Sequence, residues 1–527
     1  MTDSVLIIDA LSAGTGHRTS SRDSIGCGPR TIAGVFELHN FSCNISRIEE
    51  VLTKKGAARG FEHLAISAMS MDLPVVKQAT KMWRRTRPKG KVLLGGPIAA
   101  APRTILSEIR PDVLILGEGE ATLEHLIKSD FFETSIDLSE IPGIAFTHHS
   151  DVIITPKRPT ISEEHLSDYF QPSTIRIMDY PGYQASRVYV EVLRGCSNFQ
   201  RTKIRLPDGR SCTDCGSCDS IDPSTRLDCP EDIPPGCGFC SVPTTWGAPR
   251  SRSEAAIVRE IQSLLDLEVH RIVLEAPGFL DYQRGPYPLT TPCSPSANIE
   301  AVSSLLSKIK SLPQMQDGTA HLSIENIKAC LFTESVAETF SRFLPGNTPN
   351  IGMESGSESH ARAIGKCSSP QDVLKAVRIA KKHNLDPFVY LIYGLPGEDF
   401  LTIKKSIEMV EELTDIGVER IILYGFRPLP GSAFADFEPP LHDSPMITKL
   451  KKAVRTANRD RKFTYLGRVI KSIAAEPSKT HSGYTMFYPL QEGPLITAQG
   501  GYSAGTLVNI EITEVLSDGL VRGEVVK

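Results

Sequence analysis

The sequence predicts an α/β protein with three folded parts: an N-terminal Rossmann-like, doubly wound domain, a central full or partial β/α barrel, and a small C-terminal β-barrel. Up to about residue 463, short apolar runs alternate with helix-length segments, which is typical of parallel sheets covered by helices. From residue 464, short alternating runs are separated by glycine-containing turns, which favours a small antiparallel barrel of about five strands. A chain of 527 residues is also too long for one hydrophobic core.

The composition is that of a globular protein, with 40% hydrophobic and 23% charged residues. The formal net charge of −4 gives no global attraction to nucleic acid or to a membrane surface. We expect no membrane span, because no run approaches about 18 apolar residues, and no signal peptide, so a cytoplasmic location is the default. In that compartment, twelve cysteines favour metal or redox chemistry over disulfides.

The N-terminal domain is predicted over residues 1–130, with strands at 5–8, 63–67, 92–94 and 113–116. Two of these strands run into glycine-rich turns, Gly95-Gly-Pro97 and Gly117-Glu-Gly-Glu120. In doubly wound sheets the ligand crevice lies at the carboxyl ends of the strands, so these turns are candidates for ligand binding. The alternative is that the glycines only allow tight turns. Residues 131–185 show no sustained periodicity and are predicted to be a connector.

The central part is predicted over residues 186–463. A strand-like run from 188 ends at Cys196, and further strands are expected at 271–274, 351–354, 388–393 and 420–424. Helix-length segments separate them. Repeated β/α units at this spacing predict a parallel barrel with its chemistry at the carboxyl ends of the strands.

Three cysteines of this part suggest a redox centre: Cys196 at the end of its strand, and Cys237 and Cys240 in Gly236-Cys-Gly-Phe-Cys240. Three thiolates can hold a [4Fe–4S] cluster by three of its irons and leave the fourth iron open to a substrate. An insertion at 197–236 separates Cys196 from the other two, so it has to fold back on itself.

The insertion carries four more cysteines with ligand-like spacing: Cys212, Cys215, Cys218 and Cys229. Four thiolates suit tetrahedral zinc, which would staple a short segment. A second iron–sulfur cluster and free thiols are the alternatives. The first three lack the preceding strand and following helix of the Cys196–Cys240 set, so we do not expect them to hold the open cluster.

These motifs resemble those of radical S-adenosylmethionine (SAM) enzymes, which usually carry Cys-x3-Cys-x2-Cys after the first barrel strand. Phe239 before the last cysteine is typical of that family, and the segments 352–357, 394–398 and 428–431 resemble its later strand-end motifs. The resemblance covers about residues 186–440. It departs from the family in placing forty residues where three are usual. It implies a [4Fe–4S] cluster, SAM bound near Phe239, Glu354 and Ser355, and an external electron donor. A plain strand-end turn is the alternative for Glu354 and Ser355.

The N-terminal domain resembles the cobalamin-binding domain that precedes many radical SAM enzymes. The resemblance implies cobalamin contacts at Gly95, Gly96, Gly117, Glu118 and Gly119. The usual Asp-x-His-x-x-Gly cobalt-ligand signature is absent, and in segment 9–14 a leucine stands in the histidine position. Any cobalamin is therefore expected without a protein histidine below its metal. The alternative is a degenerate or protein-docking domain.

Residues 464–527 resemble a TRAM domain, a small barrel frequent on RNA-modifying enzymes. A basic stretch precedes it, and RNA binding is one interpretation of this stretch. A solvated helix face is the other. The stretch comprises Lys449, Lys451, Lys452, Arg455, Arg459, Arg461 and Lys462.

The combination resembles the cobalamin-dependent radical SAM methyltransferases, which move a methyl group from SAM through methylcobalamin to an unactivated carbon. Within that family it is similar to enzymes that methylate a glutamine of methyl-coenzyme M reductase in methanogenic archaea, which implies the α subunit of that protein as substrate. A tRNA modifier of the methylthiotransferase kind is one alternative, although only Cys27 and Cys43 stand where those enzymes carry three cysteines. An RNA-binding or assembly protein with a structural metal cluster is another.

Overall fold

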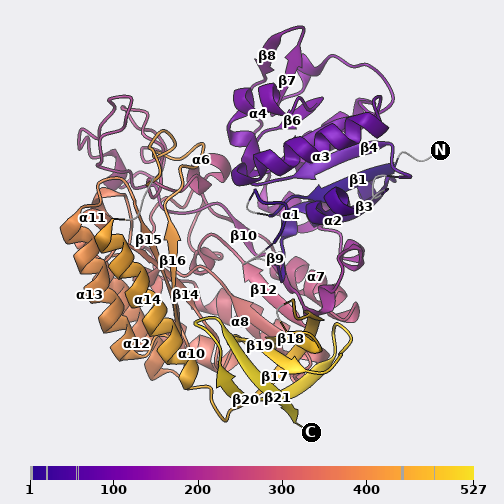
Figure 1. The fold of residues 1–527 in the computed structure, drawn as a ribbon. Coiled ribbons are helices and arrows are strands. Elements are labelled where there is room, and N and C mark those ends of the chain that lie inside the picture. Colours follow the sequence, from indigo (N-terminus) through magenta and orange to yellow (C-terminus); the bar gives the residue numbers. More distant parts are fainter. Residues whose placement is uncertain are drawn as a thin grey trace. The chain divides into compact units, whose positions relative to one another are not determined.

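The computed structural model in Figure 1 describes residues 4–12, 14–18, 22–54, 56, 59–440, 444–479 and 481–526. The chain forms two compact units. One comprises Met1–Val190 and Arg252–Leu267, and the other comprises Glu191–Ser251 and Glu268–Lys527. No helix in the described ranges is long and apolar enough to cross a membrane.

The first unit is built on a seven-stranded sheet in the order β3-β1-β4-β5-β6-β7-β8. The first five of these strands are parallel, and β7 and β8 join antiparallel. Strand interiors such as Val5, Ile7 and Leu94 are fully buried, as expected for a sheet covered on both faces. The strands are β1 (Ser4–Asp9), β3 (Ser42–Arg47), β4 (His63–Ser67), β5 (Val92–Gly95), β6 (Val113–Ile115), β7 (Ile144–His148) and β8 (Asp151–Ile154).

Six helices belong to this unit, and one of them comes from far along the chain. Helix α7 was predicted in the barrel region, but Glu260 on it lies between Arg30 and Arg252, at 2.9 and 2.6 Å, with all three side chains buried. The helices are α1 (Cys27–Leu38), α2 (Ile48–Thr53), α3 (Leu73–Thr86), α4 (Pro102–Glu108), α5 (Glu120–Lys128) and α7 (Glu254–Asp266). A short parallel pair, β2 (Ser24–Ile25) with β9 (Arg187–Glu191), also forms here.

The sheet differs from its sequence prediction at both ends. Strand β3 is an edge strand with a largely polar sequence, so its buried residues do not form an apolar run. Strands β7 and β8 lie within 131–185, the predicted connector, and they extend the sheet through the pairing of Leu114 with Ala145. These strands are only five and four residues long and partly exposed, which is too short to produce a clear period.

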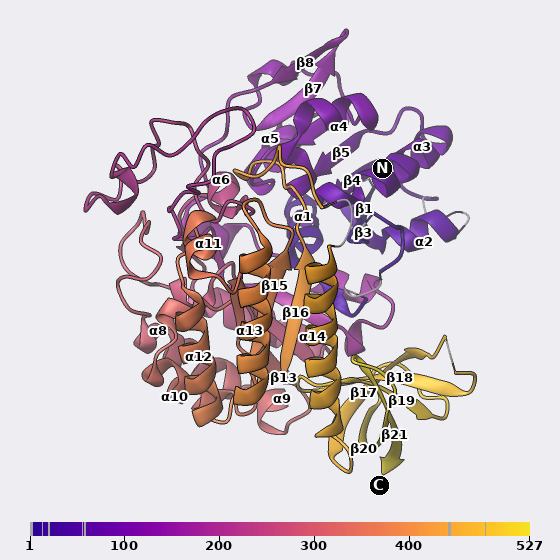
Figure 2. The same ribbon diagram turned by 60° about the vertical axis from the view of Figure 1, so that its left-hand side comes forward.

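The second unit contains a parallel β/α series, as predicted. Strand β12 pairs with β13, and β14, β15 and β16 pair in that order, while Ile327 bridges to Ile351 between the two sets. Figures 1 and 2 show α12, α13 and α14 side by side along β15 and β16. The strands are β12 (Arg271–Glu275), β13 (His321–Ile324), β14 (Asn350–Glu354), β15 (Phe388–Tyr393) and β16 (Arg420–Gly425), with an antiparallel pair β10 (Leu193–Arg194) and β11 (Arg250–Ser251).

The helices of this series begin and end at capping residues. The hydroxyl of Ser369 and the carboxylate of Asp372 form a capping box at the start of α12. Asp399 caps the start of α13, and Gly417 ends it in the left-handed region, at φ +89°. The helices are α6 (Val242–Trp246), α8 (Ile299–Lys310), α9 (Pro313–Gln316), α10 (Glu334–Phe343), α11 (Glu358–Ala363), α12 (Pro370–Lys382), α13 (Phe400–Ile416) and α14 (Pro445–Phe463).

The C-terminal residues form a closed barrel in the order β17-β18-β19-β21-β20, which confirms the predicted small five-stranded module. The barrel is not antiparallel throughout as predicted, because β19 and β21 pair in parallel. Its core contains Phe487, Ile496, Ile510 and Val521, all fully buried. Its strands are β17 (Val469–Pro477), β18 (Tyr484–Pro489), β19 (Leu495–Gln499), β20 (Leu507–Val515) and β21 (Leu520–Val526).

Candidate active site

Cys196 lies directly after strand β10, and the residue before it has to be glycine. Gly195 has φ +95°, and a Cβ atom there would lie 2.4 Å from the carbonyl oxygen of Ala248. The amide of Cys196 donates to the carbonyl of Gly247 at 3.1 Å. Because the strand packs this tightly against the 247–248 turn, the position of Cys196 is fixed by backbone contacts.

The insertion folds back to the point where it leaves the strand. The amide of Gly236 donates to the carbonyl of Gln200 at 2.7 Å, which closes the excursion just before Cys237. Inside the insertion, the buried guanidinium of Arg201 supplies the hydrogen bonds that helices or strands supply elsewhere. It donates, at 3.0–3.1 Å, to the carbonyls of Phe199, Arg226, Leu227 and Ile233.

Cys237 and Cys240 lie in a tight turn held from both sides. The amide of Cys240 donates to the carbonyl of Cys237 at 2.8 Å. Between them, Gly238 donates to the carbonyl of Ile364 at 2.7 Å and accepts from the amide of Phe434 at 2.8 Å. A Cβ at residue 238 would lie 2.4 Å from the Phe434 ring, so only glycine fits there.

Asn198 connects the two halves of the cysteine motif. The backbone amide of Asn198 donates to Sγ of Cys196 at 3.4 Å. Its side-chain Nδ2 donates to Sγ of Cys237 at 3.3 Å and to the carbonyl of Gly365 at 3.0 Å. Asn198 is 2% exposed. The sulfurs of Cys196 and Cys237, forty-one positions apart in the chain, therefore share one buried hydrogen-bonding residue.

The separation of the sulfurs fits a cluster better than a single ion. In the described part of the chain, Cys196, Cys237 and Cys240 do not all bring their sulfurs within 4.8 Å of one another. Thiolates on a single tetrahedral zinc ion, with Zn–S bonds of about 2.3 Å, lie closer together than that. A cube of irons and sulfides spreads its thiolates more widely.

The electrostatic surroundings of the three thiols provide positive charge. Burial raises the pKa of Cys196, of Cys237 and of Cys240, the last to about 11. The charge of Lys328 lowers the pKa of Cys196, and the charge of Lys366 lowers the pKa of both Cys237 and Cys240. Three thiolates in a buried site need such compensation, or a cationic iron centre, to be stable.

A buried ionic network supports the residue after Cys196. The hydroxyl of Ser197 donates to Asp281 at 2.9 Å and accepts from Lys328 at 2.6 Å and from Arg284 at 3.0 Å. Lys328 also contacts the Asp281 carboxylate directly. Burial alone would raise the pKa of Asp281, but Lys328 and Arg284 outweigh burial, so the pKa is lowered and the carboxylate stays ionised.

Glu354 ends strand β14 in a strained conformation beside the cysteines. Its φ is +65°, the β14–β15 register shifts between Gly352 and Glu354, and its carboxylate pairs with Lys366 at 3.0 Å. Its charge also raises the pKa of Cys240. A Cβ at Gly352 would lie 2.4 Å from the Glu354 carboxylate, so a glycine here leaves room for the pair.

Ser355 joins two strand-end turns through His360. Nδ1 of His360 lies 3.0 Å from the hydroxyl of Ser355, and its Nε2 lies 2.9 Å from the carbonyl of Pro396 in the Gly394–Glu398 turn. Burial lowers the pKa of His360, which favours the neutral ring. Ser355 and Glu354 therefore lie on one turn at the carboxyl edge of the parallel strands, where the sequence predicted SAM contacts.

Phe239, the third predicted SAM-contacting residue, is partly buried. It packs against an apolar cluster that includes Ile364, Leu395, Phe426 and Phe434. These residues follow helix α11 and strands β15 and β16, so the cysteine turn and the carboxyl ends of the strands share one hydrophobic support.

The four cysteines of the insertion are spread over different surroundings. Cys215 is exposed beside Ser217, Cys218 lies 3.5 Å from Arg201, and Cys212 and Cys229 pack against the apolar cluster that supports Phe239. Among the described residues, no three of these sulfurs lie within 4.8 Å of one another. Zinc binding by the insertion stays a prediction.

In the first unit, the predicted cobalamin-binding turns lie at the carboxyl edge of the sheet. Gly96 has φ +91°, and a Cβ there would lie 2.7 Å from the carbonyl oxygen of Ala68. Gly117 has φ +70° with open space where its side chain would be. Glu118 accepts from the amide of Ile161 at 2.6 Å, and Gly119 precedes α5. Gly117 therefore borders open space, whereas the Glu118 carboxylate binds the backbone of the segment that follows β8.

The alternatives that involve RNA gain little from the structure. Cys43 is buried in β3 with its pKa raised to about 12 by burial, which suits packing rather than metal binding. In the basic stretch, Lys462 and Arg461 pair with buried Glu419 at 3.4 and 2.7 Å. Lys449, Lys452, Arg455 and Arg459 are exposed on α14, so both interpretations of this stretch remain open.

Sequence reasoning missed the residues that surround the cysteines. Asn198 lies inside the insertion, and Lys328, Lys366 and Asp281 come from three separate segments between the main helices and strands. Each is a common residue type without a motif of its own. The positive φ of Glu354 and the proximity of Lys366 depend on strand pairing, so no local pattern could have indicated them.

Comparison with known proteins identifies a domain of the chain. The profile of the radical SAM superfamily matches residues 229–410, which include Cys237, Cys240 and strands β12–β15. These residues carry a radical SAM domain. Such a domain implies a [4Fe–4S] cluster and SAM, and Cys196, Cys237 and Cys240 with their lysine neighbours fit such a cluster.

Two long relatives match nearly the whole chain in sequence. The uncharacterised protein MJ1620 of Methanocaldococcus jannaschii is 40% identical over 94% of this chain and 93% of its own length. The uncharacterised protein MK0932 of Methanopyrus kandleri is 36% identical over 100% of this chain and 97% of its own. A tRNA-2-methylthio-N(6)-dimethylallyladenosine synthase of Clostridium novyi is 26% identical over 55% of this chain and 62% of its length.

Solved structures share the fold. TsrM from Kitasatospora setae, a radical SAM methyltransferase with cobalamin and a [4Fe–4S] cluster bound, superposes with a TM-score of 0.58 at 13% identity over 82% of this chain and 77% of its own. The cobalamin-dependent radical SAM enzyme OxsB, with aqua-cobalamin bound, gives a TM-score of 0.56 at 12% identity over 86% of this chain and 55% of its own.

Proposed function

We propose that this radical SAM enzyme is a cobalamin-dependent methyltransferase that transfers a methyl group from SAM to an unactivated carbon. The observation that carries the proposal is the order of its parts: a doubly wound domain with an open glycine turn at Gly117, followed by a cysteine trio at the strand ends of a β/α series. Cobalamin-dependent radical SAM enzymes share this fold.

In this proposal, SAM bound at the cluster supplies the oxidising radical chemistry, and cobalamin supplies the methyl carrier. The residues of the chain hold and orient these groups. Cys196, Cys237 and Cys240 would hold three irons and leave one open. Asn198 donates to the cluster thiolates, and such donors stabilise the reduced, more negative state.

Glu354 and Lys366 form the polar end of the SAM site in this proposal. A carboxylate suits the ribose hydroxyls or amino group of SAM, and the ammonium suits its carboxylate. Because the two side chains already pair at 3.0 Å, SAM would bind to a preorganised ion pair rather than to free side chains. The apolar residues around Phe239 exclude water from the same edge.

The favoured substrate is a glutamine in the α subunit of methyl-coenzyme M reductase. The resemblance of the domain order, including the missing cobalt-ligating histidine, supports this choice. The two long relatives come from archaea, which agrees with it. A tRNA substrate is the alternative, and the partial match to a tRNA methylthiotransferase supports it.

Anaerobic reconstitution tests the proposal. The protein with iron, sulfide and cobalamin, a low-potential reductant and SAM should yield 5′-deoxyadenosine and S-adenosylhomocysteine. The methyl-coenzyme M reductase α subunit purified from a strain lacking this gene should gain 14 mass units on one peptide, the mass of an added CH2 group on the target residue. Deoxyadenosine formation without cobalamin binding would remove the methyl-transfer proposal.

A parallel incubation with bulk tRNA separates the two substrates. Modified nucleosides in the tRNA digest, with no change in the reductase peptide, would favour the tRNA alternative. Methylated peptide with unchanged tRNA would favour the protein substrate. Omitting cobalamin in both incubations is the matched control.

A further inference from the structure

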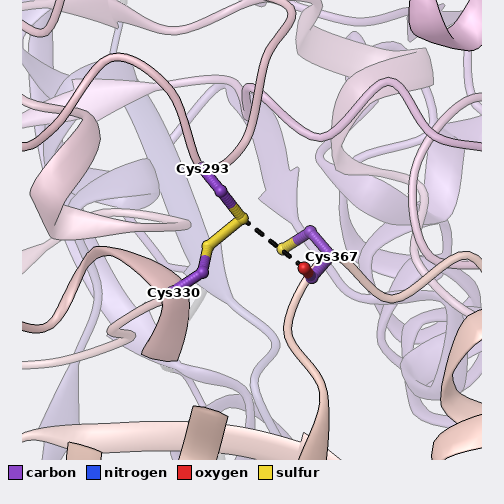
Figure 3. A group of neighbouring side chains, drawn as sticks. All are labelled: Cys293, Cys330 and Cys367. Carbon is purple, nitrogen blue, oxygen red and sulfur yellow. Dashed lines mark hydrogen bonds between the residues drawn. A yellow bond between two sulfur atoms is a disulfide. The ribbon is translucent and has the colours of Figure 1, made fainter.

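A second group of three cysteines converges in the same unit as the cluster cysteines, although no local sequence motif marks it. Cys293 lies in the loop before α8, Cys330 lies in the short helix Ala329–Leu331, and Cys367 lies between α11 and α12. Their sulfurs all lie within 4.8 Å of one another. Figure 3 shows the Cys293–Cys330 disulfide with the sulfur of Cys367 beside it.

The three segments are held in place by buried polar contacts. Arg284 donates to the carbonyls of Thr291 and Pro292 at 2.8 and 3.1 Å, which fixes the loop that carries Cys293. The amide of Cys330 donates to the hydroxyl of Ser368, next to Cys367, at 3.2 Å. The site is therefore preorganised from segments that are far apart in the sequence.

The same contacts connect this triad to the cluster cysteines. Arg284 also binds Asp281, which accepts from Ser197 beside Cys196. Cys367 follows Lys366, the partner of Glu354. The charges of Cys367 and Cys240 both act on Cys237. The triad therefore lies close to the cluster motif within one unit.

We propose that Cys293, Cys330 and Cys367 form a binding site for a single soft divalent metal ion, zinc in the first instance, with one coordination position open. A separation below 4.8 Å suits thiolates around one tetrahedral ion, and it is too small for a cube of four irons. No fourth histidine, cysteine or carboxylate completes the group among the described residues, so an external ligand such as water takes the fourth position.

The disulfide is the oxidised, metal-free form of two of these ligands. A radical SAM enzyme works only under strongly reducing conditions, because its cluster has to accept an electron. A dithiol or phosphine reductant supplies two electrons, and with two protons it converts the Cys293–Cys330 disulfide to two thiols. Zinc then replaces the three thiol protons, which are released.

The experiment is metal analysis of the anaerobic, phosphine-reduced protein. Four proteins are compared: the wild type, Cys367→Ser, Cys43→Ser, and a variant in which all four insertion cysteines are serine. We expect Cys367→Ser to lose about one zinc equivalent that the Cys43→Ser control and the insertion variant both keep. Cobalt(II) added to the metal-free insertion variant should give thiolate-to-cobalt absorption that decreases when Cys367 is also replaced.

A Cys367→His variant separates the loss of a zinc ligand from a folding defect, because its imidazole can replace the thiolate as a zinc ligand. Zinc retained by Cys367→His and lost by Cys367→Ser, with the cluster absorbance present in both, would support the site. Full zinc content in Cys367→Ser would overturn it. The proposal would also be overturned if the reduced wild type contained zinc and the variant without the insertion cysteines contained none. The readouts do not depend on methyl transfer, so they stand apart from the proposed function.

Discussion

The cluster cysteines and the Cys293/Cys330/Cys367 triad differ in the spacing of their sulfurs and in the residues around them. Both gather three sulfurs from segments far apart in the chain. The first set is spaced too widely for one ion, bordered by two lysines and hydrogen-bonded by Asn198. The second set is tighter, and its sulfurs are close enough for a disulfide. A proposed cluster site and a proposed single-ion site therefore differ in the spacing of their sulfurs and in the charge around them, and not in the number of sulfurs.

Replacing Cys237 with alanine should have the largest effect and test the first half of this comparison. Removing one of three iron ligands should abolish the cluster absorbance and reduce deoxyadenosine formation below detection. The metal bound by the triad should remain. Anaerobic absorbance spectra and product chromatography measure these outcomes, with Cys43→Ala as the control for loss of a buried cysteine. Retained SAM cleavage in the Cys237 variant would contradict the assignment of this ligand.

Asp281→Asn tests the ionic network that both sites share. The change leaves Lys328 and Arg284 buried without their carboxylate, and removing one partner of a buried ion pair costs about 3–5 kcal/mol in the free energy of unfolding. Chemical denaturation measures it, with Glu338→Gln, an exposed pair with Arg342, as a control that should change stability by less than about 0.5 kcal/mol.

The pH dependence follows from the lowered pKa of Asp281. The stability that the Asp281 carboxylate contributes is present above the ordinary pKa of an aspartate. It is lost as the pH falls through the lowered pKa of Asp281 in the folded protein. The Asp281→Asn variant should therefore lose less stability in acid than the wild type. A parallel loss in both proteins would show that the network does not act through this carboxylate.

Glu398 provides the opposite case, a half-buried carboxyl whose pKa is set mainly by burial. Burial raises its pKa to about 7, against an ordinary value near 4.5. The folded protein then keeps a proton that the unfolded chain releases, so stability falls as the pH rises from about 4.5 to 7. Glu398→Gln should remove about 1–3 kcal/mol of this penalty at pH 8 and change little at pH 4.5. Thermal unfolding at the two pH values measures it, and equal shifts at both would contradict the prediction.

Asn198→Ala should have the smallest effect and sharpen the difference in hydrogen bonding. Without Nδ2, Sγ of Cys237 loses a donor that stabilises the reduced cluster more than the oxidised one. A differential loss of about 1 kcal/mol lowers a one-electron potential by roughly 40 mV. Redox titration followed by electron paramagnetic resonance measures the shift. Asn198→Gln, which keeps the amide, is the matched variant, and a higher potential in Asn198→Ala would be the contrary result.

Much of the fold was predictable from sequence because strands with continuous apolar runs and long amphipathic helices carry their own signal. Most parallel strands of both units and the C-terminal barrel followed from that pattern. Strand β3, the four-residue strand β13, the β7–β8 hairpin and the placement of α7 did not. Edge and short strands have no clear period, and the Glu260 pair with Arg30 joins residues 230 positions apart.

The site divides in the same way. Cys196, Cys237, Cys240 and Phe239 could be predicted as site residues because their spacing and flanking strand or turn form a local motif. Asn198, Lys328, Lys366 and the Cys293/Cys330/Cys367 triad were not, because they become neighbours only when separate loops meet.

The order of the folded parts and the presence of a redox motif follow from residues that are near one another in the chain, so both can be read from the amino-acid sequence. Packing of the whole unit is needed to bring Gly236 back to Gln200, to place charges around the thiols and to gather the further sulfurs. The potential and metal preference of a thiolate site depend on distances of a few ångströms between residues, and local sequence does not set those distances.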